Sequence, residues 1–203
     1  GYTYRALLDE VARFAGVLEN QGVEKGDRVI VYMPMIPEAV VAMLACARLG
    51  VIHSVVFGGF APKELAIRID DAKPKTLVTA SCGIEFSNII EYKPLVDEAL
   101  RISSHVPETV ILLQRPQAKA SMQAGRDFDW NDLISSANPV DPVPVDATDP
   151  LYILYTSGTT GLPKGVIREN GGHAVALKYS MKVIFNTNPG EVYCCLLYTS
   201  PSP

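Results

Sequence analysis

The chain has 203 residues, of which 48% are hydrophobic and 20% charged, and its formal net charge is −4 at pH 7. This composition is typical of a globular protein and excludes general disorder. Lys and Arg are scattered, so neither a nucleic-acid groove nor a basic membrane-binding face is predicted, and no apolar run reaches the roughly 18 residues that a membrane span requires.

Strands and helices alternate through the first part of the chain. A helix is predicted from Thr3 to Gly22, because apolar residues recur at three- and four-residue spacings and Thr and Gly are favoured at helix ends. Further strands are predicted at 27–33, 51–57, 75–80 and 108–113, and further helices at 38–50, 62–73 and 92–102. This alternation predicts an α/β fold with a largely parallel sheet covered by helices.

The second part begins with residues 137–150, which contain four prolines and neither helical nor strand periodicity. We interpret this stretch as an extended connection that crosses the surface. A strand at 151–155, a Gly- and Thr-rich loop, a strand at 164–169 and an amphipathic helix at 173–185 follow.

The loop within YILYTSGTTGLPKG (152–165) has the composition of an oxyanion-binding loop. Its hydroxyls are potential donors, its glycines let backbone N–H groups approach a ligand, and Lys164 adds a cation. The candidate phosphate-binding residues are Thr156, Ser157, Gly158, Thr159, Thr160, Gly161 and Lys164. The spacing is not that of a Walker A loop, since Lys164 follows Pro163 and precedes Gly165. By composition alone a tight surface loop is an equal alternative, and the preceding buried strand favours the functional interpretation.

These residues carry a resemblance. YTSGTTGLPKGV resembles the phosphate-loop signature of the AMP-forming acyl-adenylate enzymes, which include acyl-CoA synthetases, luciferase and peptide-synthetase adenylation domains. KGDRVIVYMPMIPEAVVAMLACARLGVIHSVVFGGF (25–60) is similar to the short-chain branch, the acetyl- and propionyl-CoA synthetases, and especially to its mitochondrial member. The resemblance covers about residues 1 to 193 and implies part of the large N-terminal AMP-binding domain of that fold.

The resemblance implies an ATP-dependent short-chain carboxylate–CoA ligase. A carboxylate such as propionate or acetate attacks the α-phosphate of ATP, and coenzyme A then displaces AMP from the acyl-adenylate. The loop would bind the β- and γ-phosphates, and Lys164, with Mg²⁺, would stabilise charge on the departing pyrophosphate. The resemblance also implies a role in short-chain fatty-acid metabolism. It implies a location in the mitochondrial matrix, with the cytoplasm as the alternative.

Residues 81–92 depart from the family. Relatives carry adjacent arginines that contact coenzyme A phosphates, whereas this chain has Asn88 and Ile89, which cannot replace a guanidinium. Gly83 and Glu85 still match, so the resemblance predicts a coenzyme A edge there.

The C-terminal residues also depart from the family. After GEVY the chain reads CCLLYTSPSP, so we expect 194–203 to be a non-native or a divergent tail. The alternative for the whole chain is a truncated module that binds ATP phosphates weakly, or is inert, with no ligase activity of its own.

The remaining polar residues have structural interpretations. His53 is expected to be a satisfied core histidine, Arg68 a solvated or paired surface charge, and Asp70 and Asp71 structural carboxylates. Four cysteines lack the spacing of a metal site or a disulfide framework, which predicts reduced thiols, an intracellular protein and no metal site in this segment.

Overall fold

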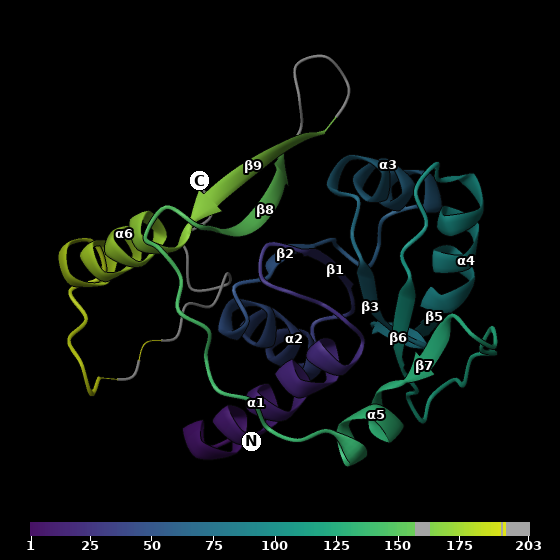
Figure 1. The fold of residues 1–203 in the computed structure, drawn as a ribbon, viewed down its shortest axis with the longest axis horizontal. Coiled ribbons are helices and arrows are strands. Elements are labelled where there is room, and N and C mark those ends of the chain that lie inside the picture. The colour runs from purple at the N-terminus through teal and green to yellow at the C-terminus, as the bar shows by residue number, and fades with distance from the viewer. Residues whose placement is uncertain (157–162, 192, 194–203) are drawn as a thin grey trace.

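The computed structural model describes residues 1–156, 163–191 and 193. Helices and strands follow one another in the order shown in Figure 1. Their bounds are α1 Tyr4–Asn20, β1 Arg28–Tyr32, α2 Pro37–Arg48, β2 Ile52–Val55, α3 Pro62–Ala72, β3 Thr76–Ala80, β4 Cys82–Glu85, β5 Asn88–Glu91, α4 Tyr92–Ile102, β6 Thr109–Leu113, β7 Asp127–Asp129, α5 Trp130–Ser136, β8 Pro150–Thr156, β9 Lys164–Glu169 and α6 Asn170–Val183.

The described strands form a seven-stranded sheet in the order β7-β6-β3-β1-β2-β8-β9, together with the separate β4–β5 hairpin. Neighbours from β7 to β8 are parallel, and β9 joins the edge antiparallel to β8. This confirms the predicted α/β fold with a largely parallel sheet. Among the described residues, no helix combines the length and hydropathy of a membrane span.

Side chains alternate between two cores on opposite faces of the sheet. Val29 and Val31 of β1 point into the core beneath α1, α2 and α5, while Ile30 and Tyr32 point into the core beneath α3 and α4. Strands buried on both faces have no polar side, which explains their continuous apolar runs. Figure 1 shows the two helical layers on either side of the central strands.

Helix ends follow the residues that the sequence marks. The Thr3 side-chain oxygen accepts a hydrogen bond from the Ala6 N–H at 3.1 Å, which caps α1 as predicted. Pro37 is the first residue of α2, where its missing N–H is not needed. Gly22 follows α1 with φ of +77°, a conformation favourable to glycine.

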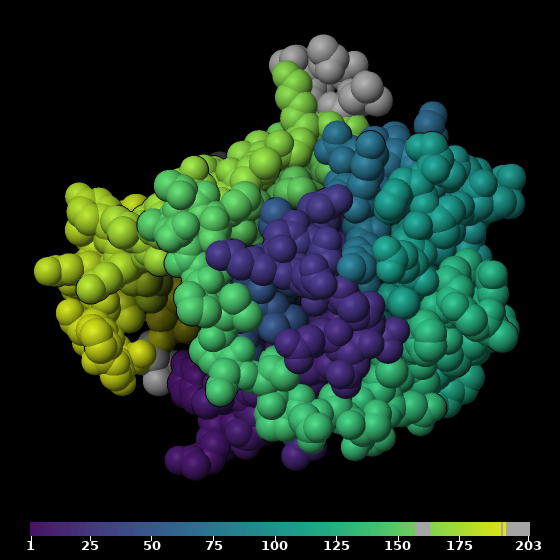
Figure 2. Space-filling model, viewed as in Figure 1, coloured from purple at the N-terminus to yellow at the C-terminus, as the bar shows by residue number. Residues whose placement is uncertain are grey.

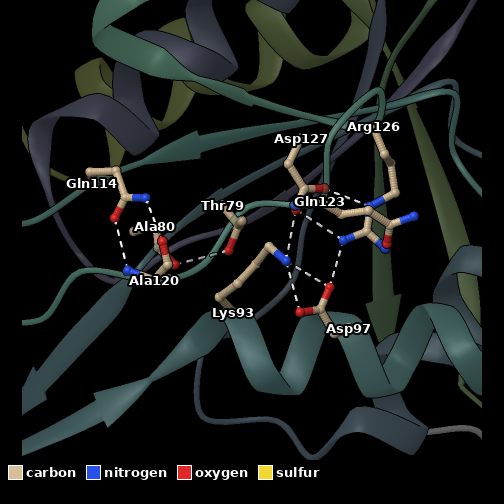
Figure 3. A network of polar contacts seen from close by, with 9 residues as sticks. All are labelled: Thr79, Ala80, Lys93, Asp97, Gln114, Ala120, Gln123, Arg126 and Asp127. Carbon is tan, nitrogen blue, oxygen red and sulfur yellow. Dashed lines mark hydrogen bonds and ion pairs between the residues drawn. The ribbon is translucent and has the colours of Figure 1, made fainter.

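A buried ion-pair network joins α4 to β7 (Figure 3). Lys93 Nζ lies 2.8 Å from Asp127 Oδ2 and 2.7 Å from each carboxylate oxygen of Asp97. Arg126 contacts the same two carboxylates, at 2.5 Å from Asp127 and 2.6 Å from Asp97. Two cations balance two carboxylates, and the Lys93 and Asp127 side chains are only 3% and 0% exposed. Removing one partner would therefore leave an uncompensated charge in the interior.

The β8–β9 hairpin and α6 extend from the side of this body (Figure 1). Residues 137–150 lead to them along the surface, as Figure 2 also shows, in the extended form predicted from the prolines. Lys25 fixes the end of this connection through the Pro144 carbonyl at 3.1 Å and Asp149 at 2.8 Å. No residue of α6 is buried, in contrast to α1 to α5.

Candidate functional site

Two of the predicted phosphate-binding residues lie at the described end of the β8–β9 hairpin. Thr156, the last residue of β8, is the register partner of Lys164, the first residue of β9, and both are exposed. The other predicted members, Ser157, Gly158, Thr159, Thr160 and Gly161, lie outside the described residues. The structure thus brings together Thr156 and Lys164 at the base of the loop.

This hairpin stands at the carboxyl edge of the parallel strands. β8 runs parallel to β2, with Tyr152 opposite His53, so Thr156 lies toward the same edge as the ends of β1 and β2. Open α/β sheets bind their ligands outside this edge, because the connecting loops and helix starts surround it. The position of the loop base is therefore that of a ligand site in this class of fold.

Helix α3 contacts the hairpin near the base of the loop, through two charged residues. The Tyr155 hydroxyl donates a hydrogen bond of 2.6 Å to Asp71 Oδ2. The Arg68 guanidinium carbon lies 5.5 Å from the centre of the Tyr155 ring and 4.7 Å from that of Phe60. Arg68 is 6% exposed and paired with Glu64 at 2.9 Å, so the expected pairing is present but the predicted surface position is wrong.

A cavity of about 480 Å³ lies beside the hairpin, at the same edge of the sheet. Glu85 of β4 and Leu154 of β8 both line it, so the predicted coenzyme A edge and the β8–β9 hairpin adjoin one space. Most of the wall is apolar, with Met33, Val56 and Phe57 among the lining residues. Such a mixture of apolar wall and few charged groups is typical of small-molecule sites.

Arg115 supplies a cation to this cavity, which the sequence analysis missed. Its backbone N–H binds Ser81 Oγ at 2.9 Å, and Nη1 binds the Cys82 carbonyl at 3.0 Å. Asn88 and Ile89, which stand where the resemblance implies arginines, are exposed on β5 opposite Glu85 and Ile84. A single Arg between a strand end and a turn gives no sequence signal, because only the fold brings it to the cavity.

Gly83 has a packing role in this region. A Cβ at Gly83 would lie 2.8 Å from the hydroxyl oxygen of Tyr92, whose ring is buried beside the cavity. Tyr92 in turn packs on Tyr32 with ring centres 5.2 Å apart. The Tyr32 hydroxyl donates to the carbonyls of Gly58 and Phe60, which fixes the loop after β2.

His53 is in the core, as expected, but its ring is not fully satisfied. It is 5% exposed, and Nδ1 has no hydrogen-bond partner among the described residues. Burial, followed by the charge of His173, lowers the pKa of His53 to about 4. Tyr152 lies between the two histidines, with its hydroxyl 3.4 Å from His173 Nδ1. His53 is therefore a neutral core residue near pH 7.

The described residues do not form a magnesium site by themselves. Mg²⁺ prefers several oxygen ligands in an octahedral arrangement. Within residues 1–156, 163–191 and 193, no group of three or more His, Cys, Asp or Glu side chains could hold a metal ion. At the described base of the loop, Thr156 contributes an exposed hydroxyl and Lys164 an exposed ammonium group.

Comparison with known proteins identifies the family. The AMP-binding enzyme family matches residues 1–200, and the chain belongs to this family. An uncharacterised protein of Pseudomonas aeruginosa is 62% identical over 192 residues, covering 95% of this chain and 31% of its own length. The mitochondrial acyl-CoA synthetase short-chain family member 3 of Mus musculus is 56% identical over 192 residues, covering 94% and 28%. Propionate–CoA ligase of Escherichia coli is 50% identical over 198 residues, covering 96% and 31%.

A solved structure shows the same fold. Acetoacetyl-CoA synthetase from Streptomyces lividans matches with a TM-score of 0.84 and 30% identity, over 93% of this chain and 29% of its own. The chain therefore spans less than a third of the length of these relatives. Homology to short-chain acyl-CoA synthetases and propionate–CoA ligase is established by these matches.

Proposed function

We propose that this chain is the N-terminal segment of an AMP-forming short-chain carboxylate–CoA ligase, acting on propionate or acetate with ATP and coenzyme A. The observation that carries the proposal is the TSGTTGLPKG loop, whose ends Thr156 and Lys164 are paired at the carboxyl edge of a sheet of this family. In this proposal residues 1–193 are a partial AMP-binding domain and 194–203 a non-native or divergent tail.

The proposed role of the loop is to hold the β- and γ-phosphates of ATP. Hydroxyls of Thr156, Ser157, Thr159 and Thr160 and the N–H groups near Gly158 and Gly161 are suited to phosphate oxygens. Lys164 would stabilise the negative charge that develops on the departing pyrophosphate as the carboxylate attacks the α-phosphate. Lys164 is therefore proposed as a charge stabiliser and not as a nucleophile.

The proposed coenzyme A edge is the cavity wall that Glu85 lines, with Gly83 behind it. Arg115 is the cation that could meet an anionic group there in place of the arginines that this chain lacks. The mitochondrial matrix is proposed as the location because the mammalian relative's name includes that organelle; the cytoplasm remains the alternative.

The second candidate is a module that binds ATP phosphates without catalysis. It is favoured by one observation, that this chain matches less than a third of each relative. We expect the 203-residue chain alone to form no thioester from ATP, propionate and coenzyme A. Steady thioester formation by the purified chain would contradict this expectation.

A chimera tests the proposed function. Residues 1–193 would replace the matching segment of the E. coli propionate–CoA ligase, and pyrophosphate release and propionyl-CoA formation would be measured. We expect an active chimera in which Lys164→Ala lowers kcat for adenylation by roughly 10²- to 10³-fold, with a smaller effect on KM for propionate. Lys178, an exposed residue of α6, provides the matched control Lys178→Ala. Unchanged pyrophosphate release by the Lys164→Ala chimera would remove Lys164 from the mechanism.

A further inference from the structure

We infer that Tyr155 and Asp71 are positioning residues that fix the base of the proposed phosphate-binding loop onto α3. The inference rests on the proposed function, because it assigns a task to residues outside the phosphate-binding set itself. Tyr155 directly precedes Thr156, and its register partner Gly165 directly follows Lys164. A contact made by Tyr155 therefore acts on both described members of that set.

The other attachments of β8 to the sheet lie at residues 152 and 153, before the strand reaches the loop. In the described part of the chain, β8 has one register pair with β2, Tyr152 opposite His53, and Ser54 Oγ adds a bond of 3.0 Å to the Ile153 carbonyl. Beyond these residues the hairpin extends from the body (Figure 1). Tyr155 lies two residues beyond Ile153, closer to the loop. Rotation of the hairpin about the attachments at residues 152 and 153 would displace Thr156 and Lys164.

The hydrogen bond between Tyr155 and Asp71 is suited to resist that pivot. Its length of 2.6 Å is typical of a hydroxyl bound to a carboxylate, a stronger interaction than a bond between neutral groups. Burial, followed by the hydrogen bond to Asp71, raises the pKa of Tyr155 well above its usual range. The hydroxyl therefore remains protonated and continues to donate at any physiological pH.

The Arg68 guanidinium also contacts the Tyr155 ring. Buried Arg68 lies between the rings of Phe60 and Tyr155, and its Nη1 binds both the Glu64 carbonyl and the Glu64 carboxylate. A cation over an aromatic face is attracted to the ring, so Arg68 favours this ring position. Its contact with Phe60 also links the base of the phosphate-binding loop to the loop after β2, which lines the 480 Å³ cavity.

Gly165 allows β9 to approach this point. A Cβ there would lie 3.0 Å from Ile153 Cγ2, 3.2 Å from Tyr155 Cε1 and 3.4 Å from Asp71 Oδ2. The backbone next to Lys164 is thus packed directly on the Tyr155–Asp71 contact. Three elements, α3, β8 and β9, meet at this position. Their packing fixes the position of the Lys164 backbone at the start of β9.

Two measurements on the 203-residue chain test the inference. The first is amide hydrogen exchange at residues 155, 156, 164 and 165 without ligand, and the second is the affinity for inorganic triphosphate by titration calorimetry. We expect Tyr155→Phe and Asp71→Ala each to speed exchange and weaken triphosphate binding by about tenfold, the effect of losing one charge-assisted hydrogen bond. The double variant should be no worse than either single variant, because both remove the same bond.

Conservative and matched variants separate positioning from folding. Asp71→Asn keeps an acceptor oxygen for the Tyr155 hydroxyl, so exchange and affinity should recover to within about threefold of wild type. Tyr179→Phe and Asp9→Asn change exposed residues of α6 and α1 and should leave both measurements unaltered. All variants should retain the unfolding midpoint of the central sheet, which a general loss of structure would lower.

The outcomes distinguish this inference from the proposed function. A wild-type chain that binds no triphosphate overturns the proposed function of the loop, while the exchange rates still decide whether Tyr155 and Asp71 hold the hairpin base. A wild-type chain that binds triphosphate, with Tyr155→Phe and Asp71→Ala binding equally well, overturns the positioning role. Unchanged exchange at residues 155, 156, 164 and 165 in both variants also overturns it.

Discussion

The central strands and the β8–β9–α6 segment differ in how they are stabilised. Strands β1, β3 and β6 are covered by helices on both faces, and most of their side chains are fully buried. The β8–β9 hairpin is at the sheet edge, no residue of α6 is buried, and Leu154, Ile167 and Leu177 are about half exposed. Hydrophobic burial therefore maintains the first region, whereas a few specific contacts hold the second.

This difference separates stability from the proposed chemistry. The residues that we assign to phosphate binding lie in the weakly buried segment, where local opening costs less than global unfolding. The hydrogen bond between Tyr155 and Asp71 is therefore expected to affect the position of the phosphate-binding residues more than it affects the free energy of global unfolding. Variants in the two regions should therefore give different kinds of loss.

The largest loss of stability is expected in the buried ion-pair network. Asp127→Ala should lower the free energy of unfolding by about 3–5 kcal/mol, because the buried Lys93 would keep only the partly exposed Asp97 as a partner. Denaturant unfolding followed by circular dichroism measures this change. Glu98→Ala, which breaks an exposed pair with Arg101, should leave the unfolding midpoint unchanged. Equal effects of the two variants would contradict the assigned role of the network.

Truncation of matched leucines compares the two regions directly. Leu77→Ala, in the central strand β3, should cost about 2–5 kcal/mol because it opens a cavity in a closed core. Leu177→Ala, in α6, removes a side chain that is 53% exposed, so the unfolding free energy should change by less than about 0.5 kcal/mol. If both variants lose similar stability in denaturant unfolding, α6 is as firmly packed as the sheet and the comparison is wrong.

Acid should destabilise the central region through His53. Because burial lowers its pKa to about 4, the unfolded chain binds a proton near pH 6.5 that the folded chain does not bind. Stability is thus fully present above pH 6.5 and falls toward pH 4 by about 3 kcal/mol, the linkage free energy of this shift. His53→Gln should flatten this part of the pH profile of unfolding. A profile as steep as that of wild type would show that His53 is not the titrating group.

A smaller loss than at the buried sites is expected at the start of α1. Thr3→Ala removes the side-chain cap on the Ala6 N–H and should lower the unfolding free energy by about 1 kcal/mol. Thr3→Ser keeps the capping hydroxyl and should restore most of that loss in the same assay. A Thr3→Ser variant as unstable as Thr3→Ala would show that the hydroxyl does not act as a cap.

Periodic apolar residues allowed most of the fold to be predicted from the sequence. The predicted helix at 92–102 coincides with α4, and the strand predicted at 164–169 with β9. The β4–β5 hairpin, β7 and α5 were not assigned, because strands of three or four residues and a two-turn helix leave no periodic signal. Short elements acquire their structure from neighbours that the sequence does not reveal.

The candidate site was only partly predictable. The hydroxyls, glycines and Lys164 are contiguous, so composition and resemblance identify them together. Arg68, Asp71 and Arg115 come from distant segments, and only the fold brings them to the hairpin or the cavity. Asp71 was interpreted as a structural carboxylate, and the structure shows that its partner is the Tyr155 hydroxyl.

The most direct test of the account is ATP binding by the purified 203-residue chain, measured by titration calorimetry with wild type, Lys164→Ala and the control Lys178→Ala. We predict that wild type and Lys178→Ala bind ATP equally and that Lys164→Ala binds about 10- to 100-fold more weakly, as expected for losing a charged contact with phosphate. A wild-type chain that binds no ATP, or a Lys164→Ala chain that binds as tightly as wild type, would contradict the assignment of this hairpin to the phosphates of ATP.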